Sequence, residues 1–456
     1  MQMKKLLAGA LLLIYTQLLH AQDSTTQKLD ALITVYANLG RFNGSALVAA
    51  HGKILLQKGY GLKNADSKSM NDANTVFQIA SITKTFTSTV VLKLVEEHKL
   101  SLDDKLSKFY SGFPNGDTIT IQELLSHTSG LHNFTEEDTT INETDEQRMI
   151  PYLKTLKPDF APGTNWSYSN SGYVVLGYII QKVSGMSYWQ AVRKYIFEPL
   201  HMNNSGFDFT HLKSADKAIG YDVLNDSVQQ QSTITDSTVP FGAGAIYSTV
   251  TDMYNWNEGL KSYKIVHEGL MQQAYTPCAL HNYGFGWQID SIYGRKMLSH
   301  SGAISGFGSN FARIPGDDVC IVLLSNISGS AGSTFNVTHL TDKLLAILYH
   351  KAYTIPKKKT PVAVNKDVLK NYTGTYTIDE MNLRIDVTVG DDILIAQPYR
   401  DGHPGPTSFL HPLNNTQFYD ERDDDLEVTL DVDATGKPNG MKILQAGITR
   451  YAKKIK

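Results

Sequence analysis

Hydrophobic residues recur at different spacings in different parts of this chain. Between residues 82 and 94 they return every four positions, which is typical of a helix with one buried face. The apolar stretches 174–183 and 188–196 predict two further helices. The middle of the chain is therefore expected to be largely helical.

Strand patterns flank this helical region. Residues 45–50 and 53–57 predict a hairpin, and the continuous apolar run 319–324 is typical of a strand buried on both faces. Because these strands come from both ends of one region, we predict a single domain over 22–355. Its fold class is α+β, an α/β sandwich in which an antiparallel sheet is flanked by helices and an all-helical lobe is inserted.

The pattern changes again beyond residue 355. Two prolines and three consecutive lysines over 356–370 predict a linker. In the stretches 383–389 and 426–432 apolar and polar residues alternate, as in strands with one buried face. We predict a small antiparallel β domain over 371–456, either a sandwich or a barrel, without a catalytic constellation.

The first residues resemble a secretory signal. Lys4 and Lys5 precede an apolar run over 6–19, and the small residue Ala21 ends a plausible cleavage site. The run is too short and interrupted for a comfortable membrane span. We therefore predict a signal peptide over 1–21, no stable membrane span after its cleavage, and export to the periplasm or medium of a bacterium.

Composition narrows the classes of partner. The chain has 456 residues, 41% of them hydrophobic, and a formal net charge of −3, so it has the apolar content of a globular protein and no basic surface for nucleic acid. No glycine-rich phosphate-binding pattern follows a predicted strand. We expect a small-molecule or peptide substrate, no nucleic acid partner and no cofactor.

The two cysteines do not suggest a disulfide scaffold or a zinc site. Cys320 lies within the buried strand predicted over 319–324, where a small apolar side chain is the favoured interpretation. Cys278 follows a proline in a loop-like stretch. A bridge between them is the less favoured alternative, and no metal site is expected.

The first candidate for chemistry is the pair Ser81 and Lys84, at the start of the first predicted helix. Residues three apart share a helix face, so the amine can hydrogen-bond the hydroxyl. The pattern alone is weak, because Ser214 and Lys217 have the same spacing. A serine that caps the helix and a solvated lysine would give the same pattern.

Tyr168 and Asn170 form the second candidate. They follow a Pro-Gly pair and precede an apolar helix, so they lie where a loop enters a helix. A tyrosine near a lysine can have its pKa lowered until it accepts a proton. The asparagine amide offers a donor and an acceptor to a substrate amide, although such a pair is often ordinary loop chemistry.

The third candidate is the sequence His300, Ser301 and Gly302 at the end of a predicted strand. A strand edge can hold an extended substrate by pairing with its backbone. A lone histidine at a strand end is more often structural. The motif follows the other two candidate motifs in the chain, and this order makes a functional interpretation stronger.

In this order S-x-x-K, Y-x-N and H-x-G resemble the motif series of the penicillin-binding protein and serine β-lactamase superfamily. The closest resemblance is to the branch of class C β-lactamases, D-Ala-D-Ala carboxypeptidases and esterases. It covers residues 25–350 and is supported by three further stretches: 77–80, 124–131 and 242–249.

The resemblance implies an acyl-enzyme mechanism. It implies these roles: nucleophile for Ser81; proton transfer for Lys84 and Tyr168; contact with the substrate's acyl-side amide for Asn170; a strand-end wall for His300, Ser301 and Gly302; and an oxyanion hole for the backbone N–H groups of Ser81 and Ala303. His127 lies in a segment that resembles a structural stretch of the family, so no catalytic role is assigned to it.

One residue departs from the β-lactamase pattern. Typical β-lactamases have a lysine at the position of His300, and an imidazole with a pKa near 6.5 is mostly neutral at neutral pH. A permanent anchor for a substrate carboxylate is therefore missing. We expect protonation of His300 near pH 6.5 to affect activity, and we expect β-lactam hydrolysis to be inefficient.

These considerations predict an exported serine hydrolase that acts on a small ester or a D-amino-acid-containing peptide. A β-lactamase of class C type is the alternative within the same chemistry. A catalytically silent binding protein is the alternative from another class. The β domain, whose first strand begins near Tyr372, resembles the lipocalin-like domains appended to such hydrolases.

Overall fold

The computed structural model describes residues 24–137, 140–225, 227–328, 333–400, 403–405, 407–420, 423, 425–445 and 448–456. The segment 1–21, expected to be a signal peptide, lies outside these residues. The chain divides into two compact units, Met1–Lys351 and Ala352–Lys456. Among the described helices, none is both long and apolar enough to cross a membrane.

A six-stranded antiparallel sheet forms the centre of the first unit, in the order β2-β1-β12-β11-β10-β9. β1 pairs with β12 over its whole length, with Ala46 opposite Leu323, so the two ends of the domain meet in the sheet as predicted. The strands are β1 (Gly44–Ala50), β2 (Lys53–Tyr60), β9 (Gln288–Ile292), β10 (Arg295–Ile304), β11 (Phe307–Ile314) and β12 (Val319–Ser325).

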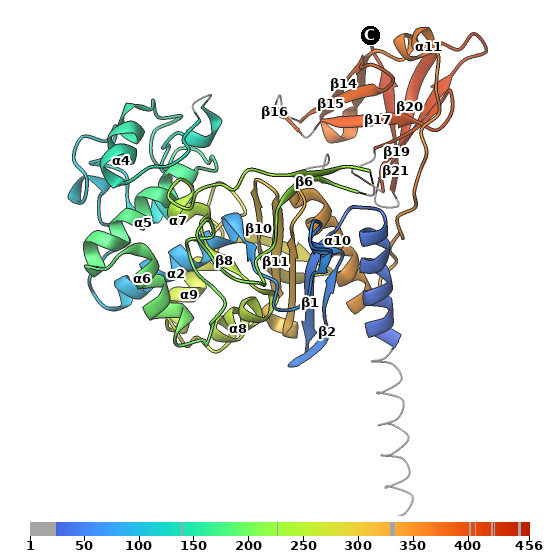
Figure 1. Cartoon of the computed structure of the whole chain (residues 1–456). Coiled ribbons are helices and arrows are strands. Elements are labelled where there is room, and N and C mark those ends of the chain that lie inside the picture. Colours follow the sequence, from blue (N-terminus) through green and yellow to red (C-terminus); the bar gives the residue numbers. More distant parts are fainter. Residues whose placement is uncertain are drawn as a thin grey trace, which may run out of the picture. The chain divides into compact units, whose positions relative to one another are not determined.

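Helices cover both faces of this sheet (Figure 1). α10 (Ser333–Leu348) packs on β10, β11 and β12, and a helix over residues 24–38 lies beside it. α8 (Val250–Lys261) packs on β1 and β12 from the other side. The arrangement confirms the predicted α/β sandwich.

The helical lobe is inserted between β2 and β9. The helix predicted from the spacing over 82–94 is α2 (Thr83–Glu96), and it is buried around most of its surface. Phe86 stacks on Trp256 of α8, with ring centroids 4.5 Å apart. The other helices are α3 (Ile121–Leu125), α4 (Glu146–Thr155), α5 (Asn170–Ser184), α6 (Tyr188–Val192), α7 (Phe241–Gly244) and α9 (Glu268–Ala274).

The helix predicted over 188–196 changes form part-way. α6 is followed directly by a π-helical turn, Arg193–Phe197. The remaining short elements of the first unit are the strand pairs β3 (Leu62–Asn64) with β4 (Ser69–Met70), β5 (Phe77–Gln78) with β8 (Tyr247–Ser248) and β6 (Tyr221–Leu224) with β7 (Gln229–Gln231), and the 3-10 turns η1 (Ala80–Ile82), η2 (Leu106–Lys108), η3 (Phe134–Glu136) and η5 (Pro315–Asp317).

The second unit is an antiparallel barrel of eight strands. β14 pairs with both β13 and β15, which closes the sheet on itself, and alternate residues of the strands fill the interior. The strands are β13 (Gly374–Ile378), β14 (Leu383–Val389), β15 (Leu394–Arg400), β17 (Ser408–Pro412), β18 (Gln417–Asp420), β19 (Glu427–Val432), β20 (Pro438–Gln445) and β21 (Ile448–Lys454), with the short β16 (His403–Pro404) paired to β15.

Part of the segment expected to be a linker is folded. The end of the predicted linker forms the helix α11 (Lys366–Asn371), which belongs to the second unit. The same unit contains the 3-10 turn η6 (Asp379–Met381), further along the chain. Asn365 caps α11 by accepting a hydrogen bond from the Asp367 N–H. Leu369 is fully buried in the barrel core, so the apolar contact with the barrel holds this helix in place.

The two cysteines are not bridged to each other. Cys320 is buried in β12, and Cys278 is partly exposed in the loop before β9. Burial raises the pKa of the Cys320 thiol to about 12, so it is an inert member of the core.

Candidate active site

Ser81 and Lys84 lie one turn apart where η1 continues into α2. Ala80 has a left-handed φ of 46°, which redirects the chain from β5 into the turn. Lys84 Nζ lies 3.1 Å from Ser81 Oγ. Ser81 is therefore in the 3-10 turn just before α2 rather than in α2 itself, and the two side chains still meet.

The Lys84 side chain is fully buried. Its Nζ also contacts Asn170 Oδ1 and the Ala243 carbonyl oxygen, each at 2.8 Å. Burial holds the pKa of Lys84 well below its usual value. A neutral amine donates two hydrogen bonds and accepts one. The two carbonyl oxygens can only accept, so in the neutral form the amine lone pair faces the Ser81 hydroxyl.

Tyr168 enters the same site from the loop before α5. The centre of its ring lies 4.8 Å from Lys84 Nζ. Burial raises the pKa of Tyr168, and the hydrogen bond with Ser81 acts in the opposite direction. The expectation that the tyrosine pKa is lowered is therefore wrong, because burial of the phenol outweighs the effect of its neighbours. Tyr168 keeps its proton at neutral pH.

Asn170 is the first residue of α5, and two neighbours orient its amide. Its backbone N–H donates to Asn133 Oδ1 at 3.1 Å, and its side-chain Nδ2 donates to Thr135 Oγ1 at 3.2 Å. These contacts turn Oδ1 toward Lys84. Nδ2 has a second hydrogen that remains available to a substrate carbonyl.

His127 supports the tyrosine from behind. Its ring centroid lies 4.4 Å from that of Tyr168, and its Nδ1 accepts a hydrogen bond from the Ser169 N–H at 3.2 Å. Burial, and then the neighbouring Lys84, hold the pKa of His127 well below its usual value. The neutral imidazole therefore packs the loop and touches the candidate catalytic groups only through Tyr168.

The end of β10 forms the opposite wall of the site. β10 pairs with β9 only as far as Ser299, so the following residues have a free edge beside η1. A Cβ on Gly302 would lie 2.4 Å from the Ile79 carbonyl oxygen. Glycine therefore lets β10 approach the segment that carries Ser81, and it brings Ser301 and Ala303 into the site with it.

His300 faces the site from β10, but both its ring nitrogens are occupied. Nδ1 lies 2.6 Å from the Ser301 carbonyl oxygen, so it carries the proton, and Nε2 lies 2.9 Å from the Tyr283 hydroxyl and accepts from it. Burial, and then the repulsion that Lys84 exerts in its protonated form, lower the pKa of His300 to about 3. The expected protonation near pH 6.5 is therefore wrong.

Sequence reasoning missed Tyr283. Its side chain is buried, and burial raises its pKa well above the usual value, so it remains a hydrogen-bond donor. The signal was the alternation of aromatic residues and glycines just before β9. Gly286, at φ +78°, brings this loop against α2, because a Cβ there would lie 2.7 Å from the Lys84 carbonyl oxygen.

The second serine and lysine with the same spacing do not form a site. Ser214 lies in a turn, where its hydroxyl accepts from the Asp216 N–H. The Lys217 amine donates to the Thr210 carbonyl oxygen at 3.1 Å. The matching spacing has no chemical consequence here, because the segment is not a helix.

The site thus brings together a serine hydroxyl, an amine with a lowered pKa, a protonated phenol and a free strand edge. This combination can carry out covalent acyl transfer. Among the described residues, no group of three or more His, Cys, Asp or Glu is placed to hold a metal ion.

Comparison with known proteins agrees with this site. The family model described as Beta-lactamase matches residues 29–345. The chain belongs to the β-lactamase family. The predicted resemblance to the serine β-lactamase and penicillin-binding protein superfamily is thereby confirmed.

Relatives of this β-lactamase family member include penicillin-binding protein 4* of Bacillus subtilis, 27% identical over 383 residues, which cover 76% of this chain and 83% of the relative. The octameric penicillin-binding protein homologue of Pyrococcus abyssi is 26% identical, with a TM-score of 0.65, over 93% of this chain and 99% of that one. The D-amino acid amidase of Ochrobactrum anthropi, at 23% identity, shares the fold with a TM-score of 0.59 over 71% of this chain and 99% of that one.

The contact at Gly302 generates a first prediction. In Gly302→Ala the added methyl group collides with the Ile79 carbonyl oxygen, so β10 must move away from Ser81. We expect kcat/KM, measured on the best ester substrate, to fall by about 100-fold, since displacements of about 1 Å have effects of this size. Gly316→Ala is the control, because a Cβ there meets nothing within 4 Å. Gly302→Ala activity within threefold of wild type would contradict the contact.

The buried imidazole generates a second prediction, about stability. The folded protein keeps His300 neutral down to about pH 3, whereas the unfolded chain protonates it near pH 6.5. The unfolded state therefore binds the extra proton between these values, and stability falls as the pH falls. Urea unfolding should show that wild type loses about 2 kcal/mol more than His300→Gln between pH 7 and pH 5. Identical losses would mean that the histidine is not held neutral.

Proposed function

We propose that this protein is an exported serine hydrolase that forms an acyl-enzyme on Ser81. One observation carries the proposal: the amine of Lys84, fully buried and with its pKa lowered, lies 3.1 Å from Ser81 Oγ. A buried base next to a hydroxyl is the arrangement that activates a serine nucleophile. The family membership is consistent with it.

In the proposed acylation step, Ser81 Oγ gives its proton to Lys84 Nζ and forms a bond to the substrate carbonyl carbon. The carbonyl oxygen gains the electron pair and is held by the backbone N–H groups of Ser81 and Ala303. Asn170 Nδ2 holds the acyl-side amide of the substrate. The Lys84 ammonium formed in this step is stabilised by Asn170 Oδ1 and the Ala243 carbonyl oxygen.

The proposed leaving-group step uses the protonated tyrosine. The bond from the carbonyl carbon to the leaving oxygen or nitrogen breaks, and that atom takes the proton of Tyr168. The Lys84 ammonium then returns a proton to the Tyr168 phenolate. Lys84 Nζ lies over the ring of this tyrosine. Water then releases the acyl group by the same proton transfers in reverse order.

The wall formed by β10 favours substrates that lack a carboxylate next to the scissile bond. His300 is neutral and both its nitrogens are occupied, so it provides no cation where β-lactamases have lysine. We propose a small ester or a D-amino-acid-containing peptide as substrate, with Ser301 and Gly302 along its backbone. The same fold serves a D-amino acid amidase.

Export is part of the proposal and rests on the signal-like pattern of residues 1–21. It places the enzyme in the periplasm or outside a bacterial cell. A class C-type β-lactamase and a silent binding protein are the alternatives. Both are outcomes of the two experiments that follow.

The nucleophile is tested by Ser81→Ala. Wild type incubated with a fluorophosphonate should gain one adduct mass, and the variant should gain none and lose about 10³-fold or more in kcat. Thermal stability should change little, because a partly exposed hydroxyl contributes little to the core. Ser214→Ala should behave as wild type. Absence of any adduct on folded wild type would favour the silent binding protein.

Substrate class is tested by His300→Lys. The lysine side chain is longer than that of histidine, so we expect its amine to extend beyond the buried position of the ring to the open edge of the site and stay charged there. The rate on nitrocefin relative to a neutral p-nitrophenyl ester should then rise about tenfold, or about 1.4 kcal/mol. The neutral ester alone should gain nothing. A wild type that already prefers nitrocefin to esters and D-Ala-D-Ala peptides would establish the β-lactamase alternative.

A further inference from the structure

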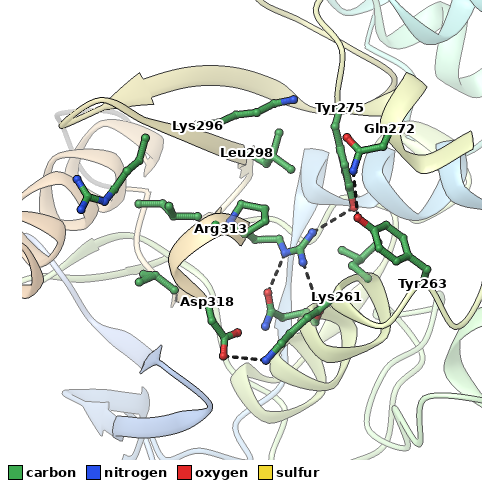
Figure 2. Close-up of a pocket in the computed structure, with 15 residues that line it drawn as sticks. Lys261, Tyr263, Gln272, Tyr275, Lys296, Leu298, Arg313 and Asp318 are labelled. Atoms are coloured by element: carbon green, nitrogen blue, oxygen red, sulfur yellow. Dashed lines mark hydrogen bonds and ion pairs between the residues drawn. The ribbon is translucent and has the colours of Figure 1, made fainter. Parts of the chain in front are cut away.

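A cavity of about 340 Å³ lies between β10, β11, α8 and α9 (Figure 2). Ser81, Lys84, Tyr168 and His300 are not among the residues that line it. Its volume is in the range of sites for small organic molecules. The mechanism proposed above makes no use of it.

Arg313 of β11 lines this cavity and is only 3% exposed. Its Nε donates to Asn257 Oδ1 at 2.8 Å, and its two terminal nitrogens donate to the Tyr275 hydroxyl at 3.1 Å and the Asn257 carbonyl oxygen at 3.5 Å (Figure 2). A guanidinium has five N–H groups, so two remain unused. These partners are all neutral, and a buried charge without a counter-charge is costly.

The charges around the cavity are unbalanced. Four cations and one carboxylate line it: Lys261, Arg295, Lys296 and Arg313, and Asp318. Lys261 pairs with Asp318 at 2.7 Å, and Arg295 pairs with Asp317 beside the cavity. Lys296 and Arg313 have no carboxylate at ion-pair distance within the described part of the chain. The lining therefore carries an excess of positive charge.

The rest of the lining is largely apolar and includes Leu260, Leu298 and Pro315. We infer that the cavity binds a small organic anion, whose carboxylate or phosphate group contacts the Arg313 guanidinium and whose apolar body lies against these three side chains. Carboxylate and phosphate share the paired oxygen geometry that a guanidinium fork binds. The ring centroids of Tyr275 and Trp287 each lie 6.0 Å from the guanidinium carbon, and the two N–H groups without a protein partner are the ones proposed to bind the anion.

The experiment uses two probes with the same apolar body, benzoate and phenyl phosphate, and benzamide as the neutral analogue. Isothermal titration calorimetry on the full chain at low ionic strength should give a Kd in the millimolar range or tighter for at least one anion, and a much weaker signal for benzamide. The ratio of the two anion affinities identifies which anionic group the site prefers.

Variants locate the binding. Arg313→Gln should weaken the anion by about tenfold or more, and the exposed rim variant Lys296→Glu by about threefold to tenfold. Lys157→Glu, an equal charge change at an exposed position outside the cavity, should leave the Kd unchanged. If Arg313→Gln does not fold, the test is the comparison of the anion Kd between Lys296→Glu and Lys157→Glu. No binding of either anion, or equal weakening by both lysine variants, would overturn the inference.

Discussion

The burial of a single amine is the constraint on which the rest of this site depends. Lys84 sits on a helix that runs through the core, and its three polar contacts come from the preceding turn and from two distant segments of the chain. Burial disfavours the charged form and lowers the pKa of this amine well below its usual value. The packing that makes the helix stable therefore also lowers the pKa of the proposed catalytic base.

The wall opposite this amine follows the same electrostatic logic. A protonated imidazole buried beside Lys84 would place an unpaired charge in the site. His300 instead stays neutral, with hydrogen bonds to the Tyr283 hydroxyl and the Ser301 carbonyl oxygen. Tyr168 likewise stays neutral because burial raises its pKa. Burial thus disfavours the charged form of each of these three side chains.

Arg313 shows the opposite outcome for a buried cation on the same sheet. A lysine loses its proton when it is desolvated, but a guanidinium cannot do so in a protein. Neutral hydrogen bonds and aromatic faces offset part of its cost, and the remaining charge attracts an anion. Lys84 is thus the proposed base, whereas Arg313 is the proposed anion-binding group.

The sequence by itself determined the fold class, the three motifs and the meeting of the two ends of the first domain in one sheet. These features depend on periodicity and residue order, which are local properties that do not depend on the details of packing. It also identified Ser81, Lys84, Tyr168, Asn170 and His300 as candidates. Only the tertiary structure decided their protonation states, because a pKa depends on burial and on partners far away in the chain. For the same reason it alone revealed Tyr283 as the partner of His300, the close approach at Gly302, and the difference between Ser81 and Ser214, whose spacing to lysine is identical.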